Sequence, residues 1–496
     1  MTENPLHAAP VILWFRSDLR LQDQACVQAA VKTGQPIIPL YIWEETLATR
    51  PLGAASKWWL YHSLKALGED LRSFGSRLII ERGAAQVTLE SLANKYRVKT
   101  IICSHTFDPA YEEHDLHLQN ELKASGLTLN RLNTSLLTEP NQVKTGEGKP
   151  FRVFTPYFKA LQASGACDVD RLPEKPSTDS WAAPAKWPSS LSIEALGLAP
   201  KLTPSGKDWS KGFGARFKPG ERGARAALRG FLQHHLRDYD SGRDRPDLDL
   251  TSHLSPHLRF GEISPQRILL ETDKAVRADN SLSMGAAKFR AELAWRDFSY
   301  GLLGQQPRLH EVNFRRDFHT FKWRQDDAGF KAWCRGETGY ELVDAGMREL
   351  WQTGYMHNRV RMVAASFLIK HLMIDWRRGE QWFWDCLVDA DPANNPASWQ
   401  WVAGCGADAA PYFRVFNPIT QAEKFDPQGI YRARYIQGYT HPSTGGIHKT
   451  VQKDLFGSGD TSMPSTAYPK PIVDHAFARQ RALEAYKQRG QDDHAD

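Results

Sequence analysis

Hydrophobic residues follow two different periodicities along the chain. Up to about residue 130, short apolar runs of strand length alternate with amphipathic stretches whose apolar side chains recur about once per helical turn. The predicted strands are 11–15, 36–43, 78–80 and 100–103, and the predicted helices are 54–74, 84–96 and 111–127. This alternation predicts a parallel sheet with right-handed crossovers, and such sheets bind ligands beyond the carboxyl ends of their strands. The first strand is not followed by the GxGxxG fingerprint of dinucleotide-binding folds.

The pattern changes after about residue 139. Pro, Ser, Lys and Gly dominate up to residue 219, which is typical of a segment that crosses the surface between domains. Beyond residue 221 the helical period prevails, and the predicted helices are 224–236, 264–278, 285–303, 327–336, 340–352, 358–376 and 475–488. The fold class is therefore α/β followed by all-α. We predict a doubly wound parallel-sheet domain at 10–135, an interdomain linker at 136–219 and a helical domain at 220–485.

The helix predicted at 358–376 is apolar on nearly every face, which places it in a core. Four residues in it are costly to bury unless they are paired or bound to something: Asn358, Arg359, Arg361 and Asp375. Asn358, Arg361 and Met362 share one helical face. An irregular run with two prolines follows at 389–396, and then an aromatic segment begins at residue 398. The stretch predicts a large polar and aromatic ligand inside a helical core.

Composition narrows the class of protein. The 496 residues are 41% hydrophobic and 24% charged, and no window approaches the roughly 18 uninterrupted apolar residues of a membrane span. The first residues lack the pattern of a signal peptide, and the six cysteines form no CxxC pair, so we expect reduced thiols in the cytoplasm and no structural metal. A net charge of +6 permits nucleic-acid binding, and the 16 tryptophans exceed what packing alone requires.

Three further stretches have both an ordinary and a functional interpretation. The hydroxyl-rich run 251–256 precedes a helix, where hydroxyls and backbone N–H groups either bind phosphate or simply cap the helix. Glu292, Trp295 and Arg296 share a helical face, which also describes any half-buried amphipathic helix. Trp323, in Phe321-Lys-Trp323, is by itself a packed aromatic near a loop.

Together these segments resemble the photolyase/cryptochrome family of flavoproteins. The motifs that carry the resemblance are WFRSDLRLQD at 14–23, TGYMHNRVRM at 353–362, DWRRGEQWFW at 375–384 and NNPASWQWVAGCGADAAPYFRVFNP at 394–418. The resemblance extends to about residue 429 and, more weakly, to about 485. It implies an N-terminal α/β antenna domain and a C-terminal helical domain that holds a U-shaped FAD.

A few positions separate the branches of this family. By resemblance Asn395 faces flavin N5, where plant-type receptors have Asp and animal-type receptors have Cys, and an amide there both donates and accepts. Enzymes for the (6-4) photoproduct carry two histidines where this chain has Asn358 and Met362. The match is to cyclobutane-dimer photolyases of class I or III type. A cryptochrome-type blue-light receptor is the alternative, and a plain DNA-binding helical module is a third hypothesis.

The implied activity is light-driven repair of cyclobutane pyrimidine dimers in UV-damaged DNA. Excited FADH⁻ passes an electron to a dimer that has been flipped out of the duplex, as in photolyases generally. Trp295 and Trp401 then form the pocket walls, and Glu292 bonds a thymine carbonyl, which requires a raised carboxyl pKa or strong solvation of the product charge. The implied DNA-binding residues are Glu292, Trp295, Asn358, Arg359, Met362, Trp401, Arg414 and Arg243, of which the arginines contact phosphates.

The resemblance also assigns cofactor contacts and an electron path. The implied FAD contacts are Tyr239, Thr251, Ser252, Leu254, Ser255, Asn358, Arg361, Asp389, Asp391 and Asn395, with Arg361 and Asp389 paired. Trp399, Trp376 and Trp323 match an electron-hopping chain from the surface to the flavin, although three tryptophans in a core also serve packing alone. Trp382, Trp384 and Tyr412 offer an alternative route.

Fewer residues in the sequence bear on the identity of the antenna pigment. The family carries methenyltetrahydrofolate or a deazaflavin, but the run Tyr111-Glu112-Glu113-His114-Asp115 departs from the best-known folate-binding pattern. The segment 50–67 resembles a branch close to the plant receptors. We expect methenyltetrahydrofolate, with Trp43 or Glu45 as contacts, and by family resemblance a monomer.

Overall fold

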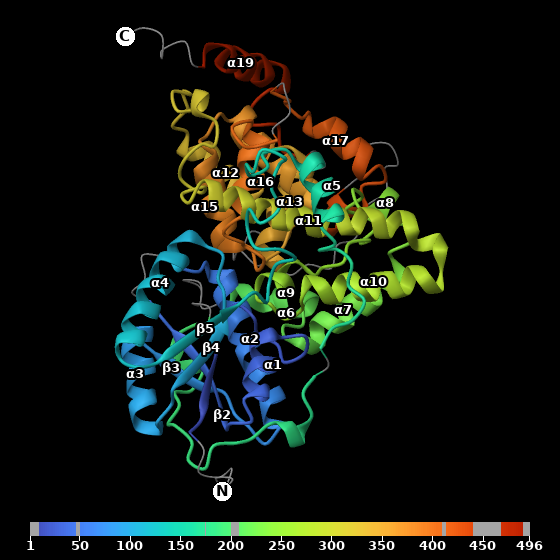
Figure 1. Cartoon of the computed structure of the whole chain (residues 1–496). Coiled ribbons are helices and arrows are strands. Elements are labelled where there is room, and N and C mark those ends of the chain that lie inside the picture. The colour runs from blue at the N-terminus through green and yellow to red at the C-terminus, as the bar shows by residue number, and fades with distance from the viewer. Residues whose placement is uncertain are drawn as a thin grey trace, which may run out of the picture.

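The structure is a computed structural model that describes residues 9–45, 50–173, 175–199, 208–408, 413–439 and 468–489. A sheet domain and a helical domain are stacked along the long axis of the molecule, with the N-terminus at the sheet end (Figure 1). The sheet contains β1 (Val11–Phe15), β2 (Ile37–Trp43), β3 (Ile79–Arg82), β4 (Thr100–Ser104) and β5 (Thr128–Leu132). The strands are all parallel in the order β3-β2-β1-β4-β5.

Helices cover both faces of this sheet, as the alternating pattern predicts. They are α1 (Ala25–Lys32), α2 (Ala54–Arg72), α3 (Ala85–Tyr96) and α4 (Pro109–Ala124). Successive side chains of β1 point to opposite faces: Leu13 lies in one apolar cluster with residues of α1 and α2, and Trp14 lies in another with residues of α3 and α4. The strand is apolar throughout because both of its faces are buried.

The region predicted as a linker contains regular structure. Within 136–219 the chain forms α5 (Phe154–Ala163) and α6 (Phe213–Arg216). Phe154, Tyr157 and Leu161 are buried, and they belong to the same apolar cluster as residues of α11 (Ser283–Gln305). The segment therefore crosses between the domains and also packs on the helical one.

The helical domain is formed by many short helices around a common core. Its first members are α7 (Glu221–His234), α8 (Tyr239–Gly242), α9 (Ser255–Arg259), α10 (Pro265–Ala278), α11, α12 (Asp327–Arg335) and α13 (Glu341–Thr353). The remainder are α14 (Asn358–Ser366), a π-helical turn (Phe367–His371), α15 (Trp376–Cys386), α16 (Asn394–Ala403), α17 (Pro418–Phe425), α18 (Ile430–Tyr435) and α19 (His475–Gln488).

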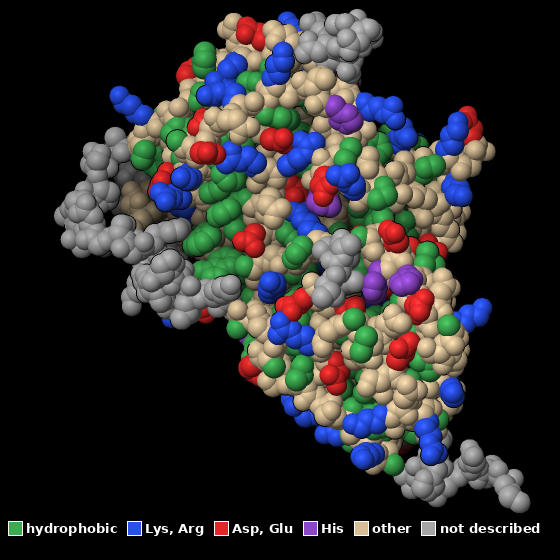
Figure 2. Space-filling view, turned by 90° about the vertical axis from the view of Figure 1, so that its left-hand side faces the viewer, with side chains coloured by type: hydrophobic (Ala, Val, Ile, Leu, Met, Phe, Trp, Pro, Cys, Tyr) green, Lys and Arg blue, Asp and Glu red, His purple; other side chains and the backbone are tan. Residues whose placement is uncertain are grey.

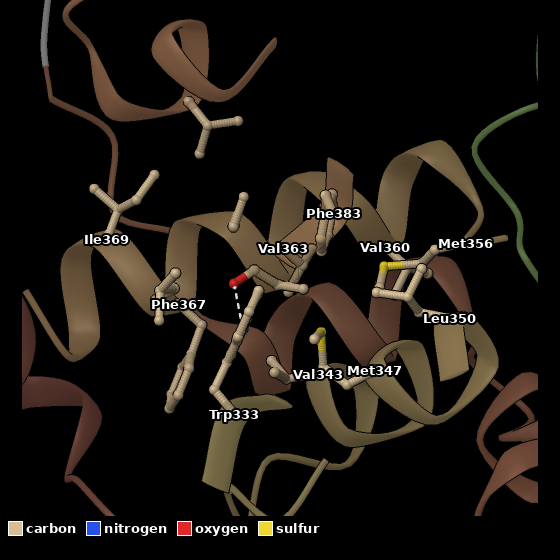
Figure 3. Packing of buried hydrophobic residues seen from close by; sticks show 14 of the residues in the cluster. Trp333, Val343, Met347, Leu350, Met356, Val360, Val363, Phe367, Ile369 and Phe383 are labelled. Carbon is tan, nitrogen blue, oxygen red and sulfur yellow. Dashed lines mark hydrogen bonds between the residues drawn. The ribbon is translucent and has the colours of Figure 1, made fainter. Parts of the chain in front are cut away.

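The prediction of one helix from 358 to 376 is wrong, although its placement in the core is confirmed. The α-helix ends at Ser366, continues as the π-helical turn and breaks near Met373, whose φ is +55°. Tertiary bonds hold the break: Arg324 donates its backbone N–H to the Met373 carbonyl at 2.8 Å, and Asp375 caps α15 at the N–H of Arg377. Figure 3 shows the packing around α14, where Trp333 Nε1 donates to the Ala364 carbonyl at 3.0 Å.

The termini of the helical domain are also tied to this core. The π-helical turn contacts α19 through His371 and His475, whose ring nitrogens lie 2.9 Å apart. Arg481 of α19 donates to the His371 carbonyl at 2.5 Å. Within the described residues, no helix combines the length and the apolar character needed to cross a membrane.

Candidate functional site

A cavity lies where the sheet meets the helical domain. Its volume is about 280 Å³, and it opens beyond the carboxyl ends of β1, β2 and β4, between which the strand order reverses. This is where open α/β sheets bind ligands. Representative lining residues are Tyr41, Trp43 and His105 from the sheet domain and Arg259, Tyr300 and Trp384 from the helical domain. Both Trp43 and Glu45, the predicted pigment contacts, line it.

The hydroxyl-rich stretch before α9 is engaged with the core rather than with the helix. Ser255 begins α9, but its hydroxyl donates to Asp389 Oδ2 at 2.6 Å, and the helix receives no side-chain cap. The cap interpretation of this stretch is therefore wrong. Ser252 Oγ accepts from the N–H of Leu254, and Leu254 itself is buried.

The predicted Arg361–Asp389 pair is present. Arg361 of α14 donates from its two terminal nitrogens to Asp389 at 3.1 and 2.9 Å, and its Nε donates to the Met356 carbonyl at 2.7 Å. Burial by itself would lower the pKa of Arg361, but Asp389, Tyr355 and Glu349 together outweigh it and the pKa of Arg361 is raised. The pair and Ser255 tie α9, α14 and the loop after α15 together.

Several buried polar atoms on α14 and on the stretches just before α14 and α9 have no hydrogen-bond partner within the described part of the chain. They are Thr251 Oγ1, His253 Nδ1, His357 Nε2 and Arg359 Nε. Burial lowers the pKa of His357 to about 3, so its ring is neutral near pH 7. Asp244, His253, Arg216 and Arg361 all act electrostatically on His357, so these groups share one region. Buried polar atoms without partners are rare in folded proteins and indicate a ligand or water.

The loop from Asp389 to Ala393 sets the start of α16. Asp391 Oδ1 accepts from the N–H groups of Ala393 and Asn394, and its Oδ2 accepts from the Tyr300 hydroxyl at 2.9 Å. The run 389–396 is thus irregular only in its first half, because Asn394, Asn395 and Pro396 already form the first turn of α16. Asp391 positions this helix.

Asn395 is buried and its amide is fully committed on the nitrogen side. Nδ2 donates to the Glu380 carbonyl at 3.1 Å and to Glu380 Oε1 at 2.8 Å. Glu380 is 1% exposed and accepts two bonds from Arg50 at 2.6 and 2.7 Å. Glu380 and Arg50 are residues that the sequence argument missed; Glu380 stands inside the DWRRGEQWFW motif, which was the available signal.

Two predicted DNA-contacting arginines are paired with carboxylates. Arg243 donates to Glu292, and Arg359 donates to Asp244 while lying over the Phe425 ring at 4.5 Å. Asp244 was not singled out from the sequence, although it follows Arg243 directly. Arg414 is exposed beside the core, and its carbonyl accepts from the buried Lys370 ammonium at 2.5 Å.

The tryptophans predicted as pocket walls contact residues from other segments of the chain. Trp295 stacks flat on Phe154, with ring centroids 3.7 Å apart and planes 7° from parallel. Trp401 Nε1 donates to the carbonyl of Asp408, whose carboxylate in turn accepts from the N–H of Phe154. Phe154 comes from α5, inside the predicted linker, where only its aromatic neighbours hinted at a packed helix.

The three tryptophans predicted as an electron path belong to one apolar cluster. Trp399 is 2% exposed and Trp376 is fully buried, while Trp323 is half-buried and packs on Phe321. Trp376 Nε1 donates to Asn313 Oδ1 at 2.9 Å, and Gly379 leaves room for the Trp399 ring. Of the alternative route, Trp384 bonds the Pro51 carbonyl and Trp382 stacks on Trp351, while Tyr412 lies outside the described residues.

The other predicted residues are placed as follows. Tyr239 is buried and packs edge-on against Phe231 and Phe289, whereas Asn358 is exposed and Met362 is half-buried on α14. On the face shown in Figure 2, basic side chains are scattered over both domains and interspersed with acidic ones. No group of three or more His, Cys, Asp or Glu side chains among the described residues is suited to a metal ion.

Comparison with known proteins identifies two family models along the chain. Residues 11–177 match the model described as DNA photolyase, and residues 289–488 match the FAD binding domain of DNA photolyase. The first model covers the sheet domain, and the second covers most of α11 and continues to the end of α19, a range that includes Arg361 and Asn395.

Known relatives match over nearly the whole chain. A deoxyribodipyrimidine photo-lyase from Agrobacterium fabrum is 47% identical over 97% of this chain and 98% of its own length. Cryptochrome-1 of Arabidopsis thaliana is 33% identical over 96% of this chain and 70% of its own length. The crystal structure of a bacterial class III photolyase from Agrobacterium tumefaciens superimposes with a TM-score of 0.87, at 46% identity over 98% of each chain.

Proposed function

The chain belongs to the photolyase/cryptochrome family, and from that premise we propose that it repairs cyclobutane pyrimidine dimers in DNA with light. The observation that carries the proposal is that two features occur together in the helical domain. A buried region with unpartnered polar atoms lies beside Arg361, and a half-exposed pair of tryptophans, Trp295 and Trp401, lies on α11 and α16. The first suits a polar cofactor and the second suits two flipped bases.

The residues fit FAD. Thr251 Oγ1, His253 Nδ1, His357 Nε2 and Arg359 Nε have bonds left to make, and these are donors and acceptors that ribityl hydroxyls, a pyrophosphate and ring carbonyls satisfy. The residues that would hold FAD are Tyr239, Thr251, Ser252, Leu254, Ser255, Asn358, Arg361, Asp389, Asp391 and Asn395. Bound FAD, reduced and excited by light, supplies the electron that opens the dimer.

The lesion site is built from flat aromatic faces. Trp295 has one face covered by Phe154, which holds its ring in a fixed plane, and Trp401 is tethered through Asp408. Stacking of a base on such a ring contributes about 1–3 kcal/mol. Met362 and Asn358 on α14 supply an apolar edge and an amide for the base edge.

The charged residues around the site would change partners on binding DNA. Arg243 holds Glu292 and Arg359 holds Asp244, so both arginines already point toward acidic groups that a DNA phosphate can replace. Once Arg243 turns to a phosphate, Glu292 is released to bond a thymine carbonyl. Arg414 adds a third phosphate contact, and we expect affinity to fall with salt accordingly.

Electrons to reduce the cofactor would reach it through tryptophan. Trp399 and Trp376 are buried and Trp323 is half-buried, so the three run from a dry interior toward solvent. Closely packed rings move little when they gain or lose an electron, which suits them to electron transfer. Trp382 and Trp384 remain the alternative route.

The cavity at the sheet edge is proposed as the antenna site, with methenyltetrahydrofolate as its occupant. Trp43 offers an aromatic surface for the pterin ring, and the basic groups of Arg16, Lys57 and Arg259 line the same cavity and suit the carboxylates of the glutamate tail. Both bonds from Arg82 to Glu45 go to Oε2, which leaves Oε1 to accept from ring N–H groups.

We place the domain limits at 10–135 and 220–485, with the connecting segment at 136–219. We also propose a cytoplasmic location, which is supported by six cysteines that are all free thiols, and a monomer by resemblance to the family. Neither proposal changes the chemistry at the site.

One experiment separates the candidate functions. The purified protein is examined for a bound flavin spectrum, then incubated with UV-irradiated DNA in blue light and in darkness. We expect bound flavin and loss of cyclobutane dimers only in the light. Bound flavin without repair would favour the cryptochrome-type receptor, and a protein without flavin would leave only a nucleic-acid-binding module.

A further inference from the structure

Arg50 of the sheet domain reaches into the helical domain. It precedes α2, lines the interdomain cavity and places its guanidinium over the Trp384 ring at 4.1 Å. From there it donates to both carboxylate oxygens of Glu380 at 2.6 and 2.7 Å. A bidentate pair of this kind fixes the orientation of the carboxylate as well as its position.

Glu380 in turn orients the side-chain amide of Asn395. Its carbonyl and its Oε1 accept the two N–H bonds of the Asn395 amide at 3.1 and 2.8 Å. Both neighbours are acceptors only, so the amide nitrogen must face Glu380. Asn395 Oδ1 is therefore the atom left to contact a ligand, and within the described residues no donor meets it.

The domain interface contains other contacts besides this ion pair. Trp384 Nε1 donates to the Pro51 carbonyl at 2.8 Å, and the N–H of Ala54 donates to Asp385 Oδ1 at 2.9 Å. Gly53 lies so close to the Trp384 carbonyl that no side chain fits there. A charged pair on Glu380, which is 1% exposed, is costly to desolvate, and such pairs are often kept for the geometry they impose.

We propose that Arg50 is a positioning residue that sets the reduction potential of the cofactor from the other domain. It holds Glu380, Glu380 holds the Asn395 amide, and the amide presents an acceptor oxygen to flavin N5. That acceptor stabilises flavin forms that carry a proton on N5, which are the reduced forms, and it does not favour the oxidised form, whose N5 can only accept. The inference rests on the proposed function through the placement of FAD against Asn395.

The test compares Arg50→Gln with a matched control in the FAD-loaded protein. Arg222→Gln removes a second arginine–carboxylate pair between the domains, to Asp70 at 2.8 Å, which touches neither the cavity nor Glu380. Each variant is equilibrated with redox dyes, and the ratio of reduced to oxidised flavin is read from its absorption spectrum. Flavin stoichiometry and melting temperature are measured in parallel.

For Arg50→Gln we expect the reduced-to-oxidised ratio at fixed potential to fall about tenfold, equivalent to about 30 mV for the two-electron couple between oxidised and fully reduced flavin. Arg50→Lys keeps the positive charge but cannot donate two parallel bonds to Glu380, so its reduced-to-oxidised ratio should lie between those of the wild type and Arg50→Gln. Glu380→Gln should reproduce Arg50→Gln, and it provides the test if Arg50→Gln binds no flavin. Arg222→Gln should leave the ratio unchanged.

The outcomes are distinct. If Arg50→Gln and Glu380→Gln bind flavin at the wild-type ratio of reduced to oxidised forms, Arg50 has only a structural role and the inference is overturned. If Arg222→Gln shifts the ratio as much as Arg50→Gln does, the effect is one of domain docking and the inference also fails. If the wild-type protein holds no flavin, the proposed function itself fails.

Discussion

Two groups of tryptophans in the helical domain occupy opposite environments. Trp376 and Trp399 are buried in an apolar core, with exposures of 0% and 2%, and Trp376 has its ring nitrogen satisfied by Asn313. Trp295 and Trp401 are half-buried, one lying flat on Phe154 and the other tethered by a single bond to the Asp408 carbonyl.

The difference teaches how one residue type serves two purposes. A relay needs rings that are dry and immobile, and close packing provides both conditions. A stacking platform needs an open face, so its ring is fixed from behind or by its edge instead. If this division holds, substitutions in the first group change stability or electron supply, and substitutions in the second group change DNA binding.

The largest effect is expected at Trp376. Replacement by Ala empties a fully buried site and leaves Asn313 Oδ1 with a lost bond, so we expect unfolding free energy to fall by about 3–5 kcal/mol. Denaturant titration measures it, and Trp376→Phe should recover most of the loss. A drop below 1 kcal/mol for Trp376→Ala would place this ring in the same class as Trp295.

Trp295→Ala tests the second group of tryptophans, the half-buried pair. It removes the stacking platform, so affinity for DNA carrying a dimer should weaken by about 1–3 kcal/mol, or roughly fivefold to 150-fold. Titration with damaged and undamaged oligonucleotides measures it, and binding to undamaged DNA should change little. Phe154→Leu is the companion variant, since it frees the Trp295 ring without deleting it and should cost less. Equal weakening on both DNAs would contradict a role in dimer recognition.

Trp399→Phe separates electron supply from packing. Phe keeps most of the buried volume, so the stability change should stay below about 1.5 kcal/mol. Photoreduction of oxidised flavin should nevertheless be lost, while protein reduced chemically beforehand repairs at the wild-type rate. Flash photolysis and a repair assay with dithionite-reduced protein check the two halves. Normal photoreduction would favour the route through Trp382 and Trp384.

The smallest effect is the pH dependence of stability that arises from a buried carboxyl group on α11, the helix that carries Trp295. Asp297 of α11 accepts from the N–H groups of Leu137 and Thr138, and burial raises its pKa from 3.8 to about 7. A raised carboxyl pKa means that its stabilising contribution is full below pH 3.8 and is lost as pH rises through about 7. Stability measured by thermal unfolding should therefore fall as pH rises from about 4 to about 7, by at most about 1.4 kcal/mol per pH unit from this group, and this contribution to the slope should vanish above pH 7. The slope should flatten in Asp297→Asn, and an unchanged slope would exclude Asp297 as its source.

Much of the fold could be predicted because local patterns carry it. Four strands and their helices follow from apolar runs, and β1 is recognisable since both of its faces are buried. The fifth strand, β5, was missed because Thr128-Leu-Asn-Arg-Leu132 carries polar residues at the sheet edge. The π-helical turn was missed because nothing in the largely apolar run at Phe367–His371 marks a break, and the bond from the Arg324 N–H to the Met373 carbonyl comes from another segment.

The candidate site was predictable only where the chemistry is concentrated in motifs. The Arg361–Asp389 pair was implied by the family resemblance and is explained by the cost of burying either charge alone, and the structure contains it. Asp244, Glu380, Arg50 and Phe154 were missed since each acts through a partner far away in the sequence. Arg50 and Glu380, for example, are 330 residues apart.

Phe154 has a consequence for anyone who recombines members of this family. The ring that backs Trp295 arrives from α5, inside the stretch whose composition predicts only an interdomain linker. A hybrid that joins one sheet domain to another helical domain should therefore transplant α5 together with α11, because cutting between them would separate a recognition surface from its own support.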